Sequence, residues 1–216
     1  MGLYHRYMVL FQPLHYYRAI IEQLLFPQPQ AARNLLRLPH APYIEKLYLF
    51  ALFNYQNKKV QTLVKYLKNH NDHNLARRLA KHMHEELLEY LSEERAYGFF
   101  KDPLVIAMPI SSKSKRVRGF NQVQALSKYL SKNLDARLCH PRKIIKSETK
   151  KQALLAKSER RANVAGCFQI KDASFFSNRD CIIVDDLITT GASMDELRAR
   201  LILAGARNVI GISIAH

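Results

Sequence analysis

The stretch from Cys181 to Ser193 constrains the fold more than any other part of this 216-residue chain. Four consecutive apolar residues, Cys-Ile-Ile-Val, predict a strand that is buried on both faces. Such strands are typical of a parallel sheet covered by helices on each side. Two acidic residues, Asp185 and Asp186, follow directly. Open parallel sheets bind their ligands at the carboxyl ends of the strands, so this acidic pair stands where a ligand is expected.

The turn after the acidic pair predicts a phosphate-binding loop. A glycine lets the backbone approach a ligand closely. The amides of the turn and of the helix that follows carry partial positive charge, and threonine and serine hydroxyls add donors. The loop residues are Thr189, Thr190, Gly191, Ala192 and Ser193.

The acidic pair indicates a ligand that offers more than phosphate. Two adjacent carboxylates repel an anion, so a site for phosphate alone would avoid them. Ribose hydroxyls would donate hydrogen bonds to Asp185 and Asp186, and a bound Mg²⁺ would use the same oxygens. The structural alternative is a strand that ends in Asp-Asp for solubility before a capped helix. That alternative does not account for the whole stretch from Cys181 to Ser193.

This stretch resembles the phosphoribosyl-diphosphate signature of the type I phosphoribosyltransferases. In that family an apolar strand, an acidic pair and a Thr-Thr-Gly-x-Ser/Thr loop run in the same order. The resemblance implies that Asp185 and Asp186 hold the ribose hydroxyls and that residues 189–193 hold the 5′-phosphate. It also implies that the ligand is phosphoribosyl diphosphate with Mg²⁺ as the cofactor.

The rest of the chain favours an α/β fold with a parallel sheet flanked by helices, because strand and helix patterns alternate. We expect two parts: a helical N-terminal extension or linker over residues 1–46 and a phosphoribosyltransferase-like domain over residues 47–216. Strands are expected at residues 47–55, 104–108, 142–146, 181–184 and 208–214. Helices are expected at residues 14–26, 59–69, 74–91, 120–134, 158–163 and 195–204.

The positive charge of the chain gathers in its middle. The net charge is +16, and residues 101–161 hold 16 Lys or Arg against 4 Asp or Glu. A field of this sign attracts polyanions such as a diphosphate sugar or a nucleic acid. We interpret residues 109–119 as a basic loop that opens from a strand end, and residues 147–156 as a second, polar and flexible loop.

These two segments resemble the ComF family, phosphoribosyltransferase-like proteins linked to DNA uptake in natural competence. The matching motifs are Arg118-Gly119-Phe120-Asn121-Gln122, Thr149 with Gln152, Glu159-Arg160 with Asn163, and Gly166 with Phe168. The resemblance covers about residues 48–216.

The resemblance to the ComF family implies roles for both basic segments. The residues that would approach the diphosphate are Pro109, Ile110, Ser111 and Ser112. The residues of the flexible basic segment are Arg116, Arg118, Thr149, Lys150, Lys151 and Gln152. The alternative for the two arginines is a solvated loop, and for the Glu-Arg-x-x-Asn motif it is a purely structural contact.

The cysteines separate this chain from many ComF relatives, which carry an N-terminal zinc ribbon built from four cysteines. Here the cysteines are Cys139, Cys167 and Cys181, so none lies in the first part of the chain. We therefore expect no structural zinc, and we expect reduced thiols because the spacing is wide and irregular. No apolar run reaches the roughly 18 residues that cross a bilayer, and no signal peptide is visible. A cytoplasmic protein without a membrane span is expected.

Three functions are compatible with one phosphoribosyl-diphosphate site. The first is a competence protein that handles incoming single-stranded DNA, with a competence helicase as the partner that the resemblance implies; the basic middle of the chain suits such a strand. The second is a phosphoribosyltransferase whose acceptor the sequence does not reveal. The third is a sensor that binds the diphosphate sugar without turning it over. We prefer the first.

Overall fold

The structure, a computed structural model of the chain, describes residues 28–42, 44, 48–93, 100, 102–148 and 164–216. The helices are α2 (Gln30–Arg33), α3 (Lys58–Asn69), α4 (His73–Glu93), α5 (Ser112–Arg118), α6 (Gln122–Asn133) and α8 (Ala192–Leu203), with 3₁₀ turns η1 (Leu35–Arg37) and η2 (Pro141–Lys143). The strands are β1 (Leu49–Phe53), β2 (Leu104–Ala107), β3 (Arg137–Leu138), β4 (Ile144–Lys146), β5 (Phe168–Ile170), β6 (Asp180–Leu187) and β7 (Asn208–Ala215).

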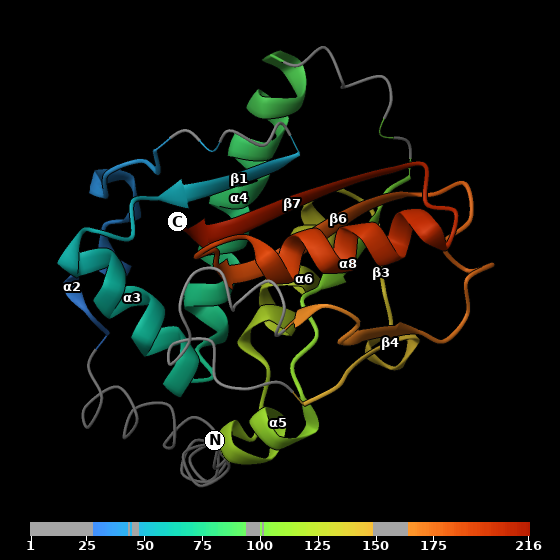
Figure 1. Cartoon of the computed structure of the whole chain (residues 1–216). Coiled ribbons are helices and arrows are strands. Elements are labelled where there is room, and N and C mark those ends of the chain that lie inside the picture. The colour runs from blue at the N-terminus through green and yellow to red at the C-terminus, as the bar shows by residue number, and fades with distance from the viewer. Residues whose placement is uncertain (1–27, 43, 45–47, 94–99, 101, 149–163) are drawn as a thin grey trace, which may run out of the picture.

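A five-stranded parallel sheet organises these elements, in the order β1-β7-β6-β2-β3. Helix α8 lies in front of the sheet in Figure 1, and α4 crosses behind it. Helix α4 also packs on α6, which contacts β2 and β6. A small antiparallel pair, β4 with β5, stands apart from this sheet. The prediction of a parallel sheet flanked by helices is confirmed.

The central strands show why continuous apolar runs were needed. Residues 181–184 of β6 are all buried, and so are residues 104–106 of β2. Since α8 covers one face of the sheet and α6 the other, both orientations of the alternating side chains must be apolar. Full burial of one isoleucine such as Ile183 contributes about 1.5–3 kcal/mol, so an acidic residue there would disrupt the sheet.

The interpretation of residues 109–119 as a loop was wrong from Ser112 onward, because that segment forms helix α5. The side chain of Ser111 accepts the backbone N–H of Ser114 at 3.3 Å and caps the first turn. Gly119 ends the helix in a left-handed conformation, with φ at 75°. Such a conformation favours glycine. The density of positive charge had hidden these two capping signals.

The acidic pair belongs to its strand and does not follow it. Strand β6 continues to Leu187 because β7 pairs with it along its length, with Asp185 opposite Ser213. The helix that follows begins at Ala192, three residues earlier than expected. The predicted helices over 59–69, 74–91 and 120–134 correspond to α3, α4 and α6 with bounds shifted by a few residues.

The segment around α2, which falls within the expected N-terminal helical extension or linker, contributes to the core. Ala32, Leu35 and Leu38 are buried with the other apolar core residues, and α2 packs on α3. The predicted helices over 14–26 and 158–163 lie outside the described residues, and the domain boundary at residue 46 stays a prediction. Among the helices that the structure describes, none has the length and apolar character of a membrane span.

Candidate functional site

Strand pairing brings two of the predicted segments to one edge of the sheet. Strands β2 and β6 are parallel neighbours, and the N–H of Met108 donates to the carbonyl of Val184 at 2.8 Å. The segment 109–112 therefore leaves β2 beside the acidic end of β6. The phosphate loop, residues 189–193, leaves the same end of β6. Both segments are positioned to contact a single extended ligand at the carboxyl edge.

Asp186 is buried and already engaged by other side chains. The side-chain amide of Gln122 donates to one of its carboxylate oxygens, and Lys68 Nζ lies 3.5 Å from the other. Gln122 is the first residue of α6, whose start is fixed because the Asn121 side chain accepts the N–H of Val123. Asp186 thus joins α3, α6 and β6 on one face of the sheet.

Asp185 points to the opposite face, because successive residues of a strand alternate. Its carboxylate accepts the N–H of Asp186 at 2.8 Å. Burial raises the pKa of Asp185, and the neighbouring charge of Asp186 raises it further, to about 7. Lys146 and Lys68 act in the opposite direction but do not offset the burial. The ionised carboxylate is therefore costly here, and a cation or hydroxyl donors would stabilise it.

The predicted phosphate loop leads into α8 through Gly191. Gly191 has φ at 75° and occupies the N-cap position, where it offers no capping side chain. The hydroxyl of Thr190 accepts the N–H of Ala192 at 3.4 Å, which orders the turn. A glycine at this position therefore leaves room for an anion at the helix start.

A cavity of about 390 Å³ borders this loop. Ile188, Thr189 and Thr190 line one side of it, and Pro42 with the residues that follow β1 and β7 lines the rest. The carbonyl of Ile188 lies 3.2 Å from His216 Nδ1, which ties the start of the loop to the end of β7. The exposed Thr189 side chain thus stands beside a hollow large enough for a sugar phosphate.

In residues 109–112, the segment expected to approach the diphosphate, Ser111 is held in place by its hydrogen bond to the start of α5. Ser111 is buried and caps α5, whereas Ser112 is exposed. A carboxylate oxygen of Glu148 accepts the N–H of Lys113 at 2.8 Å, and this bond is the largest cause that lowers the pKa of Glu148. The turn already interacts with one anionic group. Arg116 lies exposed on α5.

Other predicted residues are not brought into this arrangement by the described structure. Arg118 is the last residue of α5. The four residues Thr149, Lys150, Lys151 and Gln152 lie outside the described residues, as does the Glu-Arg-x-x-Asn motif. Their roles stay predictions.

Sequence reasoning missed the two side chains that hold Asp186. Gln122 was part of the motif that carried the family resemblance, but no contact was assigned to its side chain. Lys68 has no local signal, because a lysine on an amphipathic helix is usually solvated. Only the packing of α3 near the end of β6 reveals it.

The donor set at the acidic pair fits a magnesium ion that is held partly by its ligand. Mg²⁺ prefers oxygen ligands and usually takes one or two carboxylates together with phosphate oxygens and waters. Asp185 supplies such oxygens, whereas those of Asp186 are engaged by Gln122 and Lys68. The buried Oε1 of Gln122 has no hydrogen-bond partner in the described part of the chain. No cluster of three or more His, Cys, Asp or Glu occurs among the described residues, so an all-protein cage is not found there.

The fold and this edge define a parallel α/β protein with an acidic strand end and a glycine-capped loop before α8. No protein-family model matches the chain. It is similar to DNA utilization protein YhgH of Escherichia coli O6:H1 (strain CFT073) and of Escherichia coli O157:H7, each 30% identical over 123 residues, and of Shigella flexneri, 29% identical. These matches cover 57% of this chain and 53% of each relative. The chain thus spans about half the length of the curated relatives it matches.

Solved structures give a more distant likeness. Two of them are described as analyses of an invariant aspartic acid in HPRTs, one an alanine mutant and the other an asparagine mutant. Each is 11% identical with a TM-score of 0.39; the matches cover 65% of this chain and 67% of the first structure, and 64% of both chains for the second. The fold described above stands on its own sheet order and does not depend on this likeness.

Proposed function

We propose that this chain binds phosphoribosyl diphosphate with Mg²⁺ at the carboxyl edge of β2 and β6. The observation that carries the proposal is the position of Asp185, whose burial raises its pKa, four residues before a loop with glycine at the N-cap of α8. A ligand with hydroxyls or a bound cation at one end and phosphate at the other satisfies both features. A plain phosphate satisfies only the second.

The proposed roles follow the order of the chain. Asp185 and Asp186 accept the ribose hydroxyls and contribute oxygens to Mg²⁺, which neutralises charge on the diphosphate. Residues 189–193 donate to the 5′-phosphate. Residues 109–112 lie where the diphosphate would extend from the sugar toward β2.

Calorimetry with phosphoribosyl diphosphate and Mg²⁺ tests this proposal. The double variant Asp185→Asn/Asp186→Asn should weaken binding about a hundredfold, since it removes both charges that the cation needs. Asp102→Asn/Asp135→Asn is the matched control, because it removes the same charge from two exposed aspartates with positive φ, which asparagine tolerates. That control should bind like the wild type. No binding by the wild type, or equal binding by both variants, contradicts the proposal.

The cellular role that we propose is the use or uptake of DNA, with single-stranded DNA as the partner. Two observations support it: the relatives named DNA utilization proteins, and the excess of Lys and Arg over residues 101–161. Affinity for a single strand should fall steeply as salt rises, because each neutralised phosphate releases a counterion. A flat salt response contradicts the electrostatic part of this role. A helicase partner and a cytoplasmic location stay predictions.

A transferase reaction is the second candidate, and its acceptor is not assigned. The favourable observation is again the desolvated Asp185 beside the phosphate loop, which would position a sugar for attack at C1. Release of diphosphate in the presence of a panel of nucleobases would show turnover. Tight binding without release over that panel would favour the sensor.

A further inference from the structure

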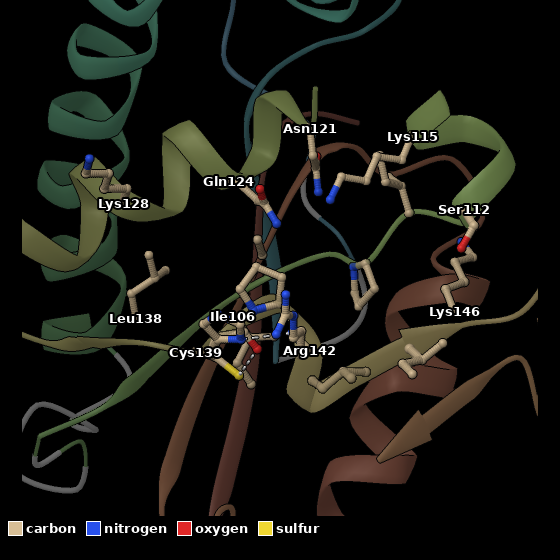
Figure 2. A pocket seen from close by; sticks show the side chains of 17 residues that line it. Ile106, Ser112, Lys115, Asn121, Gln124, Lys128, Leu138, Cys139, Arg142 and Lys146 are labelled. Atoms are coloured by element: carbon tan, nitrogen blue, oxygen red, sulfur yellow. Dashed lines mark hydrogen bonds between the residues drawn. The ribbon is translucent and has the colours of Figure 1, made fainter. Parts of the chain in front are cut away.

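A second cavity, of about 580 Å³, lies on the side of β2 that faces β3 (Figure 2). It is enclosed by α5, α6, η2 and β4, and residues 109, 110 and 112 form the wall that it shares with the edge described above. Neither Asp185 nor Asp186 lines it, and neither does the glycine-capped loop. The cavity therefore adjoins the site for which Asp185 and Asp186 are proposed but has a different set of charged lining residues.

Cationic side chains reach this cavity from separate elements of the fold. Lys115 comes from α5, Lys128 from α6, Arg142 from η2 and Lys146 from β4. The described lining residues include no Asp or Glu, and none of the four cations is ion-paired with a described carboxylate. Lys146 also lowers the pKa of Asp185, so the excess positive charge rests mainly on Lys115, Lys128 and Arg142. Like charges that converge raise the local positive potential, so the cavity favours an anion.

One face of α6 adds neutral polar groups. Asn121, Gln124 and Lys128 are spaced three and four residues apart, which places them on the same side of the helix. In Figure 2 the side-chain amide of Gln124 points into the cavity. The Asn121 amide donates to the carbonyl of Met108 at 3.4 Å, so it is held by the fold. Gln124 thus offers a donor and an acceptor beside the cationic groups.

Much of the remaining lining is aliphatic, and part of it is exposed; Ser112, Cys139 and His140 also line the cavity. Leu138 is 40% exposed and Ile145 is 43% exposed, although both are large apolar side chains. They lie at the cavity together with other aliphatic residues, namely Ile106, Ala107, Ile110 and Ile144. Apolar surface left open beside uncompensated cations is a mark of a binding site, and the volume suits a small organic ligand rather than a single inorganic ion.

We propose that this cavity binds a nucleoside monophosphate unit, either as a free nucleotide or as the 5′-terminal nucleotide of a single strand. The cations hold the phosphate, the aliphatic surface packs against the flat base, and Gln124 faces the polar groups of the ligand. The proposal does not rest on binding of phosphoribosyl diphosphate, because Lys128 and Arg142, the two cations tested below, have no role in that site.

Thymidine 5′-monophosphate is the probe, with inorganic phosphate as the comparison, and both are measured by calorimetry. The nucleotide should bind at least about tenfold more tightly than phosphate, because only it uses the aliphatic surface. Lys128→Gln/Arg142→Gln should weaken nucleotide binding about tenfold or more. The control Lys132→Gln/Arg137→Gln removes the same charge from exposed positions on α6 and β3 that do not line the cavity, and it should bind within about twofold of the wild type.

Two oligonucleotides of about eight thymidines, with and without a 5′-phosphate, distinguish the two sources of the nucleotide. If the 5′-phosphate raises the affinity of the oligonucleotide, and Lys128→Gln/Arg142→Gln abolishes that increase, the ligand is a strand terminus. Binding of the free nucleotide without that gain supports a free ligand. Equal affinity for nucleotide and phosphate, or equal loss in both charge variants, overturns the proposal. Asp185→Asn/Asp186→Asn should leave nucleotide binding unchanged, so failure of the first site is recognised separately.

Discussion

The two ends of strand β6 each hold an aspartate, but the two carboxylates differ in the partners that stabilise their charge. At the amino end, Asp180 is fully buried and accepts hydrogen bonds from Arg207 Nε and Asn208 Nδ2, each at 2.9 Å. At the carboxyl end, the half-buried Asp185 lies beside the carboxylate of Asp186, and burial raises the pKa of Asp185. Lys146 and Lys68 lower that pKa but do not offset the burial, so only Asp180 has a partner that fully satisfies its carboxylate.

This contrast assigns different physical roles to the two ends. The pair of Asp180 with Arg207 joins β6 to the start of β7 and satisfies the buried oxygens. The uncompensated charge at the other end makes the empty protein less stable than it could be, which is a common property of binding sites. The comparison therefore predicts that neutralising an aspartate has opposite effects at the two ends.

The largest expected effect is at the amino end. Asp180→Ala should lower the free energy of unfolding by about 3 kcal/mol, because it leaves Arg207 and Asn208 without their acceptor. Urea denaturation followed by circular dichroism measures this change. Glu85→Ala, which removes an exposed ion pair with Lys81 on α4, should cost less than about 0.5 kcal/mol. An equal loss of free energy of unfolding in the two variants would contradict the stabilising role assigned to Asp180.

A smaller effect of opposite sign is expected at Asp185. Its folded pKa, about 7, lies above the ordinary value of 3.8, so the folded protein binds more protons between these values and loses stability as the pH rises through them. Asp185→Asn cannot ionise. Without Mg²⁺ it should be more stable than the wild type by about 2 kcal/mol at about pH 8, and the gain should vanish near pH 4. Urea denaturation at both pH values measures the difference, and a gain independent of pH would contradict the titration.

The smallest effect concerns the loop glycine. Gly191→Ala should cost about 1 kcal/mol of stability, because alanine is strained at φ 75°. Affinity for phosphoribosyl diphosphate should fall about tenfold, since the added methyl group narrows the approach to the amides. Gly205→Ala is the control: it also has a positive φ but lies at the other end of α8, so it should lower stability alone. Calorimetry and urea denaturation together separate the two effects.

The local patterns of the sequence were sufficient for much of this picture. Unbroken apolar runs predicted β2 and β6, and the Thr-Thr-Gly-Ala-Ser turn predicted the loop before α8, because both depend on neighbours along the chain. The length of β6 was missed because its last residues are held by β7. The contact of Lys68 with Asp186 was missed for the same kind of reason, since it joins residues far apart in the chain.

The basic middle of the chain shows a different limit. The sequence predicted the positive charge, but it did not predict which of these cations lie close together in the fold. Lys115, Lys128, Arg142 and Lys146 converge on one cavity only because α5, α6, η2 and β4 fold around it. Helix α5 was not predicted because six of its seven residues are serine, lysine or arginine, so it shows no apolar face. Its capping residues were the only sign of a helix. Charge counting predicts that an anion binds, whereas the fold decides where.

The position of β7 in the sheet has a consequence for how the protein forms during synthesis. This strand lies between β1 and β6, yet it follows both of them in the chain. While the ribosome is still making β7, β1 has no neighbour in the sheet and the apolar edge of β6 is open. Pairings between distant segments form slowly and leave such edges exposed to other chains. A nascent chain of this protein therefore depends on protection from aggregation until its central strand has emerged.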